Sequence, residues 1–227
     1  MVRRLGLVPN CVLLMCIGMS VSGCGGGGKT RIRMMNAVPD ESNLALLIDG
    51  TSVAGNVAYG TSTGYMNVNS GSRHMQIEPS GAINVIIDQN ISIASGTDTT
   101  MIAEKFSTNP ASLLVLTDDN SAPTSGNFKL RVVNAAPSLG PVDLYIVAPD
   151  TDLNTVSATI SNLAFGSSTG YQSLSAGAYE IELTNVGEKF PVIDTGSQAF
   201  SSGQVRTFVG LNAQSGGFTD SILQDVN

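Results

Sequence analysis

Arg31-Ile-Arg-Met-Met-Asn-Ala-Val-Pro39 is the most informative segment of this sequence, because it recurs 98 positions later as Lys129-Leu-Arg-Val-Val-Asn-Ala-Ala-Pro137. A second match follows in the same order, since Tyr59-Gly-Thr-Ser-Thr-Gly-Tyr65 recurs 106 positions later as Phe165-Gly-Ser-Ser-Thr-Gly-Tyr171. Ordered matches with a small change of spacing indicate an internal duplication. The extra residues of the second copy are expected in the polar stretch Ala148-Pro-Asp-Thr-Asp-Leu-Asn154.

Each copy shows the two-residue period of β-strands. Apolar residues alternate with polar ones along Val142-Asp-Leu-Tyr-Ile146 and along Tyr179-Glu-Ile-Glu-Leu183. Such alternation indicates strands with one face in a core and the other face in water. The apolar runs are short and are separated by clusters of Gly, Ser, Asn and Pro, as in all-β proteins. The sequence therefore predicts an all-β protein made of two tandem antiparallel β-sandwich modules.

The first residues have the organisation of a bacterial export signal. Two arginines precede 17 mostly apolar residues, Leu5 to Val21, a run that is short for a membrane-spanning helix. The segment Val21-Ser-Gly-Cys24 resembles the lipobox of bacterial lipoproteins. This resemblance implies cleavage before Cys24 and attachment of diacylglycerol, with acyl chains such as palmitate, to the cysteine thiol.

The cysteine count agrees with a lipoprotein. Of the three cysteines, Cys11 and Cys16 lie in the segment to be removed, so the mature chain retains only Cys24. A single thiol at the new amino terminus is consistent with alkylation and allows no intrachain disulfide. Two or three acyl chains anchor a protein stably to a membrane. Gly25 follows the cysteine, where Asp would be a retention signal, so resemblance to sorted lipoproteins favours the outer membrane if the host has one.

These observations divide the chain into five parts: a lipoprotein signal peptide at 1–23, a lipidated cysteine with a Gly-rich tether at 24–30, module 1 at 31–120, a linker at 121–128 and module 2 at 129–227. The linker is short and contains Pro123, so we expect that the two modules do not tumble independently.

The duplicated segments carry a resemblance to a bacterial family. A basic residue, an apolar pair, Asn-Ala-x-Pro and a strand ending in Asp-Gly run through Arg31 to Pro39 and Leu46-Leu-Ile-Asp-Gly50. This pattern resembles the bacterial "domain of unknown function 4397" family. The resemblance implies secreted or surface-anchored envelope proteins with immunoglobulin-like sandwich modules, often in tandem, and it implies no established activity. In the second copy Ile146-Val-Ala-Pro149 stands where Asp-Gly is expected, so the resemblance does not extend to that turn.

Charge restricts the class of partner. Eleven Lys and Arg oppose 18 Asp and Glu, so the formal net charge is −7. Nucleic-acid binding requires clustered cations, so we expect no nucleic-acid partner. An acidic surface also disfavours electrostatic adhesion to anionic lipid, so the expected membrane contact is the lipid on Cys24.

No arrangement of residues predicts catalysis. The only histidine, His74, is expected to point outward from a strand and lacks the further ligands of a zinc site. Ser62 and Ser168 occupy Gly-x-Ser-x-Gly segments, but strand-like sequence follows each of them where a nucleophile elbow needs a helix. Asp150 and Asp152 begin like a calcium loop but lack its later glycine and glutamate. We therefore expect no enzyme activity, no metal and no cofactor.

The sequence favours a lipid-anchored protein of the cell envelope that acts as a non-catalytic binding or interaction module for an envelope protein or glycan. A structural spacer or surface-layer component is an alternative, and an envelope hydrolase would need clustered titratable groups that the sequence lacks. The candidate binding loops contain Tyr59, Tyr65, Phe165, Tyr171, Asp150 and Asp152. A structural interpretation of the aromatic loops is that their glycines permit tight turns and their tyrosines fill the sandwich edge, with Thr63 on the polar tip.

Overall fold

The structure, a computed structural model, describes residues 28–105 and 110–225. In module 1 the strands are β1 (Arg31–Ala37), β2 (Asn43–Ile48), β3 (Thr51–Ala58), β4 (Met66–Asn67), β5 (Gly71–Pro79), β6 (Ile87–Ile93), β7 (Asp98–Lys105) and β8 (Ala111–Asp118). In module 2 they are β9 (Asn127–Ala135), β10 (Val142–Val147), β11 (Ile160–Leu163), β12 (Ser167–Ser168), β13 (Gln172–Ser175), β14 (Gly177–Asn185), β15 (Pro191–Asp194), β16 (Gln198–Phe200), β17 (Val205–Asn212) and β18 (Phe218–Gln224). One 3-10 turn, η1 (Leu153–Thr155), follows β10. Within these described ranges no helix has the length and apolar character needed to cross a bilayer.

The strands of each module form two sheets that pack face to face. In module 1 the strand orders are β4-β1-β7-β8 and β3-β2-β5-β6. In module 2 they are β12-β9-β17-β18, with β13 also paired to β9, and β11-β10-β14-β15, with β16 also paired to β14. The named strands pair antiparallel except for β1 with β7 and β9 with β17, which are parallel. The prediction of an all-β protein with two tandem β-sandwiches is confirmed.

Each sandwich has its own apolar core between its two sheets. In module 1 the centre is built by Ile32, Met34, Leu44, Leu46, Met75, Ile77 and Met101. In module 2 the Phe128 and Phe200 rings stack with their centroids 4.5 Å apart. Leu144, Ile181, Leu183 and Phe208 pack around these rings. Equivalent positions fill both cores because a strand turns every second side chain inward.

The outer face of β10, which the sequence predicts to be exposed to water, is covered in the structure. The alternation along β10 predicts exposure of Asp143 and Tyr145, but both side chains are buried. The Asp143 carboxylate accepts hydrogen bonds from the backbone N–H groups of Asn162 at 2.8 Å and Gly187 at 2.9 Å. Lys189 Nζ donates to the Tyr145 hydroxyl at 2.9 Å. Neighbouring loops therefore close over this sheet, an effect that a two-residue period cannot reveal.

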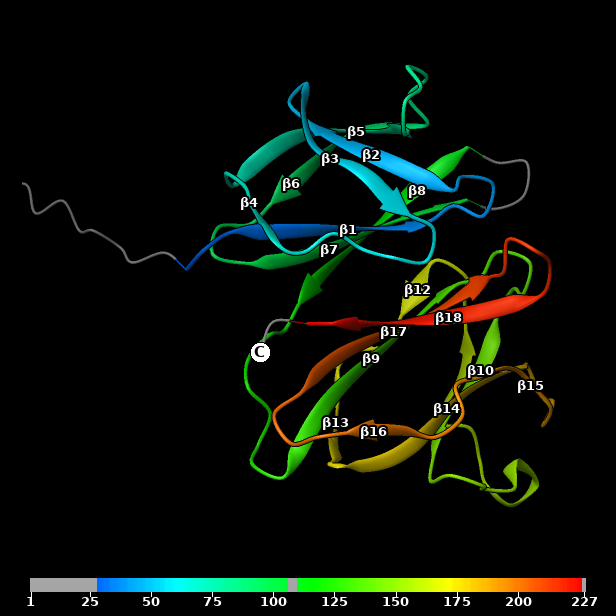
Figure 1. Ribbon diagram of the computed structural model, residues 1–227. Coiled ribbons are helices and arrows are strands. Elements are labelled where there is room, and N and C mark those ends of the chain that lie inside the picture. The colour runs from blue at the N-terminus through cyan, green and yellow to red at the C-terminus, as the bar shows by residue number, and fades with distance from the viewer. Residues whose placement is uncertain (1–27, 106–109, 226–227) are drawn as a thin grey trace, which may run out of the picture.

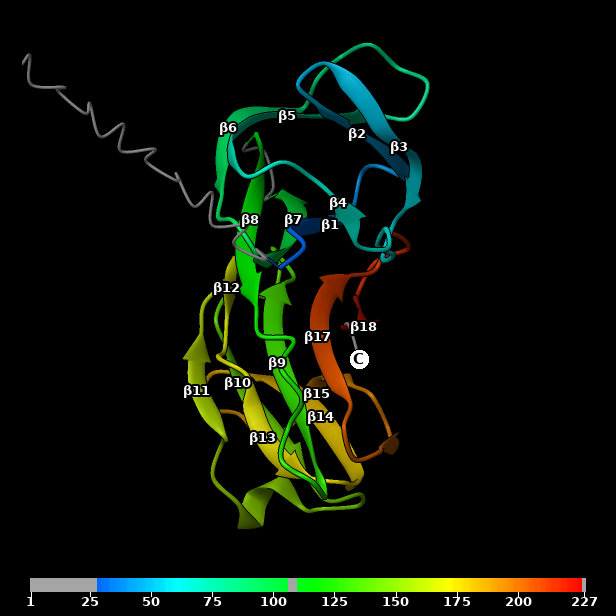
Figure 2. The same cartoon turned by 90° about the vertical axis from the view of Figure 1, so that its left-hand side faces the viewer.

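The two sandwiches pack on each other through one sheet from each, which we call the inner sheets: β4-β1-β7-β8 and β12-β9-β17-β18. The chain therefore forms a stack of four sheets, with module 1 above module 2 in Figure 1 and Figure 2. The apolar residues of this contact, here called the joint, are Met35, Ala37, Ile102, Val133, Ala135, Val209, Leu211 and Leu223. Because both faces of the inner sheets are covered, β1 and β9 are buried along almost their whole length.

Candidate functional site

The lipidation site Cys24 and the cleavage site before it lie outside the described residues, so lipid attachment stays a prediction. The described chain starts at Gly28 beside the turn between β6 and β7, where the Gly96 N–H donates to Thr30 Oγ1 at 2.8 Å. Gly28 to Thr30, the last residues of the predicted tether, therefore lie at this end of module 1.

Tyr65, one of the candidate binding residues, lies at the joint. The guanidinium carbon of Arg33 is 4.7 Å from the centre of the Tyr65 ring, a cation–π distance. The Tyr65 hydroxyl donates to the Asp118 carboxylate at 2.6 Å. Tyr171 makes the equivalent two contacts in the second copy, at 4.6 Å and 2.8 Å. Burial is the main cause that raises the pKa of both tyrosines, so both hydroxyls stay protonated donors at neutral pH.

Two arginines and two carboxylates connect the modules reciprocally. Arg33 of module 1 forms a buried ion pair with Asp225 of module 2. Arg131 of module 2 forms a buried pair with Asp118 of module 1, with the nitrogen and oxygen 2.6 Å apart. Each carboxylate also accepts a threonine hydroxyl of its own module, at 2.7 and 2.9 Å. Because buried charges need a full set of partners, this network favours one orientation of the modules.

The first glycine of each repeated loop lies against the other module. A Cβ atom at Gly166 would lie 2.8 Å from Glu104 Oε1, and one at Gly60 would lie 3.8 Å from Leu211 Cδ1. Both glycines have positive φ, 68° and 72°, which side chains other than glycine rarely adopt. The glycines therefore serve the turn, and at Gly166 also a close approach between modules.

The remaining candidate residues of these loops are also engaged within the chain. The Tyr59 hydroxyl donates across the joint to the Asn212 carbonyl oxygen, whereas its counterpart Phe165 has no hydroxyl. Thr63 is partly buried and pairs with β1, since its Oγ1 accepts the Met34 N–H at 2.9 Å and its N–H donates to the Met34 carbonyl at 2.8 Å. The structure therefore assigns these loops to the joint, and ligand binding by them stays a prediction.

Asp150 and Asp152 lie exposed in the loop that follows β10. Asp152 accepts the Asn154 N–H at 2.9 Å, and this hydrogen bond is the main cause that lowers the pKa of Asp152. The Asp150 N–H donates to Glu180 at 3.1 Å. In the part of the chain that the structure describes, no group of three or more His, Cys, Asp and Glu is placed to hold a metal ion. The arrangement is that of a capped turn.

The serines and the histidine considered for catalysis lie on different elements. Ser62 bridges to Met35 on β1, whereas His74 lies on β5 in the other sheet of module 1. The Nε2 atom of His74 is 2.6 Å from Asp88 Oδ1 on β6. Ser168 lies on β12 and pairs with β9. Neither serine sits on the strand-to-helix turn that a nucleophile elbow needs.

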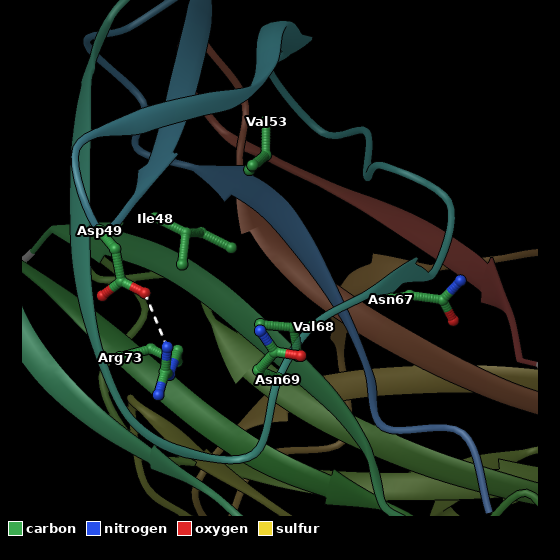
Figure 3. A pocket seen from close by; sticks show the side chains of 7 residues that line it. All are labelled: Ile48, Asp49, Val53, Asn67, Val68, Asn69 and Arg73. Atoms are coloured by element: carbon green, nitrogen blue, oxygen red, sulfur yellow. Dashed lines mark hydrogen bonds and ion pairs between the residues drawn. The ribbon is translucent and has the colours of Figure 1, made fainter.

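A hollow of about 290 Å³ opens on module 1 (Figure 3). The turn between β2 and β3 forms one wall, and the segment from β4 to the first residues of β5 forms the other. Its lining residues are Ile48, Asp49, Val53, Asn67, Val68, Asn69 and Arg73. We call it the module 1 pocket.

Asp49 and Arg73 form the charged side of the module 1 pocket. Asp49 Oδ2 lies 2.9 Å from Arg73 Nη1, and Asp49 Oδ1 accepts the His74 N–H at 3.0 Å. The hydrogen bond from the His74 backbone, and then Arg73, lower the pKa of Asp49, so this carboxylate is ionised at neutral pH. Asp49 and Gly50 both have positive φ, 50° and 76°, as in a type I′ hairpin turn. The turn therefore presents a fixed carboxylate to the pocket.

The lining of the pocket also includes two asparagines with exposed side chains, Asn67 and Asn69. Figure 3 shows Asn69 beside Val68 and nearer to Arg73, whereas Asn67 lies further off with its amide directed away from the Asp49–Arg73 pair. Ile48, Val53 and Val68 supply the apolar lining. A few hydrogen-bond donors and acceptors around an apolar surface are typical of a small-molecule site. The Asp-Gly turn was the only part of this pocket that the sequence pattern pointed to.

The fold defines a class of protein: a tandem β-sandwich, here with a hollow on module 1. The chain belongs to the family described as "Domain of unknown function (DUF4397)", whose model matches residues 30–145. The match covers module 1 and continues into β10 of module 2. No curated protein matches the chain.

Three solved structures are similar to the chain at low identity. A family 26 carbohydrate-binding module from Eubacterium rectale Amy13K, in complex with maltoheptaose, is 9% identical with a TM-score of 0.29, covering 87% of this chain and 98% of that one. An α-glucan-binding streptococcal virulence factor is 10% identical with a TM-score of 0.27, covering 85% and 97%. A putative cell adhesion protein of Bacteroides fragilis is 9% identical with a TM-score of 0.22, covering 88% and 98%. At these TM-scores the likeness carries no inference about what this chain binds.

Proposed function

We propose that this protein is a non-catalytic binding protein of the bacterial cell envelope, and that its module 1 pocket binds a neutral, hydroxyl-rich ligand of the glycan class. One observation carries the choice of ligand. The ion pair of Asp49 and Arg73 and the side chains of Asn67 and Asn69 line one hollow together with apolar residues. Attachment to a membrane through lipid on Cys24 is part of the proposal and rests on the sequence.

The chemistry of the pocket suits hydroxyl groups, which both donate and accept hydrogen bonds. The Asp49 carboxylate accepts, the Arg73 guanidinium donates, and the amides of Asn67 and Asn69 do both. The apolar lining provides a surface for the C–H groups of a sugar ring. Because Asp49 already holds Arg73 in place, little side-chain freedom is lost when a ligand binds.

A structural spacer is the second candidate function, and the joint is the observation that favours it. Reciprocal ion pairs and a shared apolar cluster hold the two modules as one stack. A rigid stack keeps a fixed distance between its two ends. This role predicts no captured glycan and no effect of pocket substitutions on the protein's activity in cells.

The test uses an array of neutral oligosaccharides of glucose, galactose and N-acetylglucosamine, probed with the mature two-module protein. We expect at least one of these glycans to bind, and the double variant Asn67→Ala/Asn69→Ala to bind it at least tenfold more weakly, which corresponds to about 1.4 kcal/mol. Asn90→Ala is the matched control, because Asn90 is an exposed asparagine on β6 outside the pocket. Absence of binding, or equal binding by the double variant, would contradict the assignment of this pocket.

A further inference from the structure

Module 2 has a hollow of its own, with a volume of about 280 Å³. It lies where β16, on the outer sheet of this module, faces β17 and β18 of the inner sheet. These strands lie on the lower module in Figure 1. The hollow is lined chiefly by Gln198, Phe200, Gln204, Arg206, Ile222 and Gln224. We call it the module 2 pocket.

Arg206 is the cation of the module 2 pocket. Along β17 it shares the inward side with Phe208, which belongs to the sandwich core. Arg206 Nη1 donates to the Val205 carbonyl at 2.8 Å, and within residues 28–105 and 110–225 no carboxylate forms an ion pair with it. Burial lowers the pKa of Arg206, and the charge of Asp225 offsets this only in part. The oxygens of Asp225 already accept hydrogen bonds from Arg33, Thr207 and Tyr171.

The duplication gives an internal comparison for this pocket. Arg206 pairs with Leu130 on β9, and Thr99 pairs with Ile32 on β1, so Arg206 and Thr99 occupy equivalent positions. The same registers relate three further pocket residues to module 1: Gln204 to Thr97, Gln224 to Thr117 and Gln198 to Ile91. Module 1 therefore has neither a guanidinium nor an amide at these places. Of the two copies, only the second carries a guanidinium and side-chain amides at these equivalent positions.

We propose that the module 2 pocket binds an acidic sugar of the uronic-acid class, with Arg206 as the residue that holds its carboxylate. A guanidinium presents parallel N–H donors that match the two oxygens of a carboxylate. Gln198, Gln204 and Gln224 supply donors and acceptors for ring hydroxyls. Phe200 and Ile222 provide the apolar surface.

The volume of the module 2 pocket further limits the size of the ligand that it can hold. Its volume of about 280 Å³ is just below the range for small-molecule sites, roughly 300–1,000 Å³, so it suits a ligand no larger than one sugar ring. The site lies on a different module from the neutral-ligand pocket and shares no residue with it. The ligand assigned to the module 1 pocket and the ligand assigned to the module 2 pocket can therefore be tested independently.

The test is calorimetric titration of the mature two-module protein with glucuronate, with glucose and inorganic phosphate as comparison ligands. We expect glucuronate to bind, and glucose and phosphate to bind at least tenfold more weakly. Arg206→Thr introduces the residue type that module 1 carries at this register, and it should weaken glucuronate binding at least tenfold. Lys105→Thr removes a partly exposed cation of the same charge outside the pocket and should leave the affinity unchanged.

Three results would overturn this proposal: no glucuronate binding, equal affinity for glucuronate and either comparison ligand, or full affinity in a folded Arg206→Thr variant. If Arg206→Thr fails to fold, Arg206→Gln, which is closer in size, is titrated instead, and full glucuronate affinity in that folded variant would likewise overturn the proposal. The Asn67→Ala/Asn69→Ala variant should keep its glucuronate affinity, so failure of the module 1 pocket is distinguishable from failure of this one.

Discussion

Arg33 and Asp225 lie 192 positions apart in the sequence and form an ion pair that is almost completely buried between the two modules. Arg131 and Asp118 form the same pair with the roles of the modules exchanged. In each copy the arginine is the third residue of the repeated segment, Arg31 to Pro39 or its counterpart. The arginine at the third position of the repeated segment therefore forms an ion pair between the modules in both copies.

The asparagine of the same segment forms hydrogen bonds within its own module. Asn36 Nδ2 donates to the carbonyl oxygens of Glu41 at 3.0 Å and Val57 at 3.2 Å, and Asn36 Oδ1 accepts the Val38 N–H at 3.0 Å. Asn134 makes the equivalent three hydrogen bonds in module 2. Such fully satisfied buried amides hold the loops that follow β1 and β9.

Replacing Arg33 by Met should destabilise the whole chain. The substitution leaves the buried Asp225 carboxylate without its counter-charge, so we expect the free energy of unfolding in urea to fall by about 3–5 kcal/mol. The control is Lys105→Met, which removes an exposed ion pair with Asp40 and should cost no more than about 1 kcal/mol. Equal losses in the two variants would contradict a structural role for the buried pair.

Thr63→Ala tests whether the repeated loop is held against β1 or forms an exposed tip. The substitution removes the acceptor of the Met34 N–H on β1, so we expect a loss of about 1–2 kcal/mol in thermal unfolding. Thr61 is exposed in the same loop, and Thr61→Ala should change stability by no more than about 0.5 kcal/mol. A loss of that small size in both variants would support the exposed-tip interpretation.

Glu104 should make stability depend on pH. Its side chain is 6% exposed, and burial raises its pKa from 4.5 to about 7. The folded state therefore holds this proton more tightly than the unfolded state. Its contribution is complete below pH 4.5 and is lost as the pH rises through about 7.

Glu104→Leu should remove this loss. Leu is the residue type at the equivalent position 211, which is buried in the joint. Urea midpoints measured from pH 4 to 8 should fall with pH in the wild type and change less in the variant, in the same window. An identical pH profile for the two proteins would show that Glu104 is ionised in the folded state without cost.

Cys24→Ser tests the anchor in the producing bacterium. Labelling with an alkyne analogue of palmitate should mark the wild-type protein and leave the Cys24→Ser variant unlabelled and uncut. Cys16→Ser is the matched control, because Cys16 lies in the segment expected to be removed, and this variant should keep its label. Equal labelling of wild type and Cys24→Ser would exclude lipid attachment at this cysteine.

The duplication and the two-residue period suffice to predict tandem sandwiches, because both are visible within short stretches of sequence. They do not predict that β1 lies beside β7 in parallel, since strand order depends on contacts between distant segments. The burial of Asp143 is hidden for a similar reason. Its partners Asn162 and Gly187 lie 19 and 44 positions further along the chain.

The candidate sites show the same limit. The sequence indicates that the loops containing Tyr65 and Tyr171 are important, because they occur twice, but it does not show that each hydroxyl meets a carboxylate more than 50 positions away. Asn67 and Asn69 carry no motif at all. They form a pocket only because the chain after β4 passes the turn at Asp49.

The reciprocal joint imposes an order in time on folding. A ribosome adds about 5–20 residues per second, so Asp225 is made roughly 10–40 s after Arg33. From the synthesis of β8 until the second half is made, the nascent first half exposes an uncovered sheet that includes Met35 and Ile102. The half-made chain is therefore the species most prone to aggregation, and only the arrival of the second half ends that exposure.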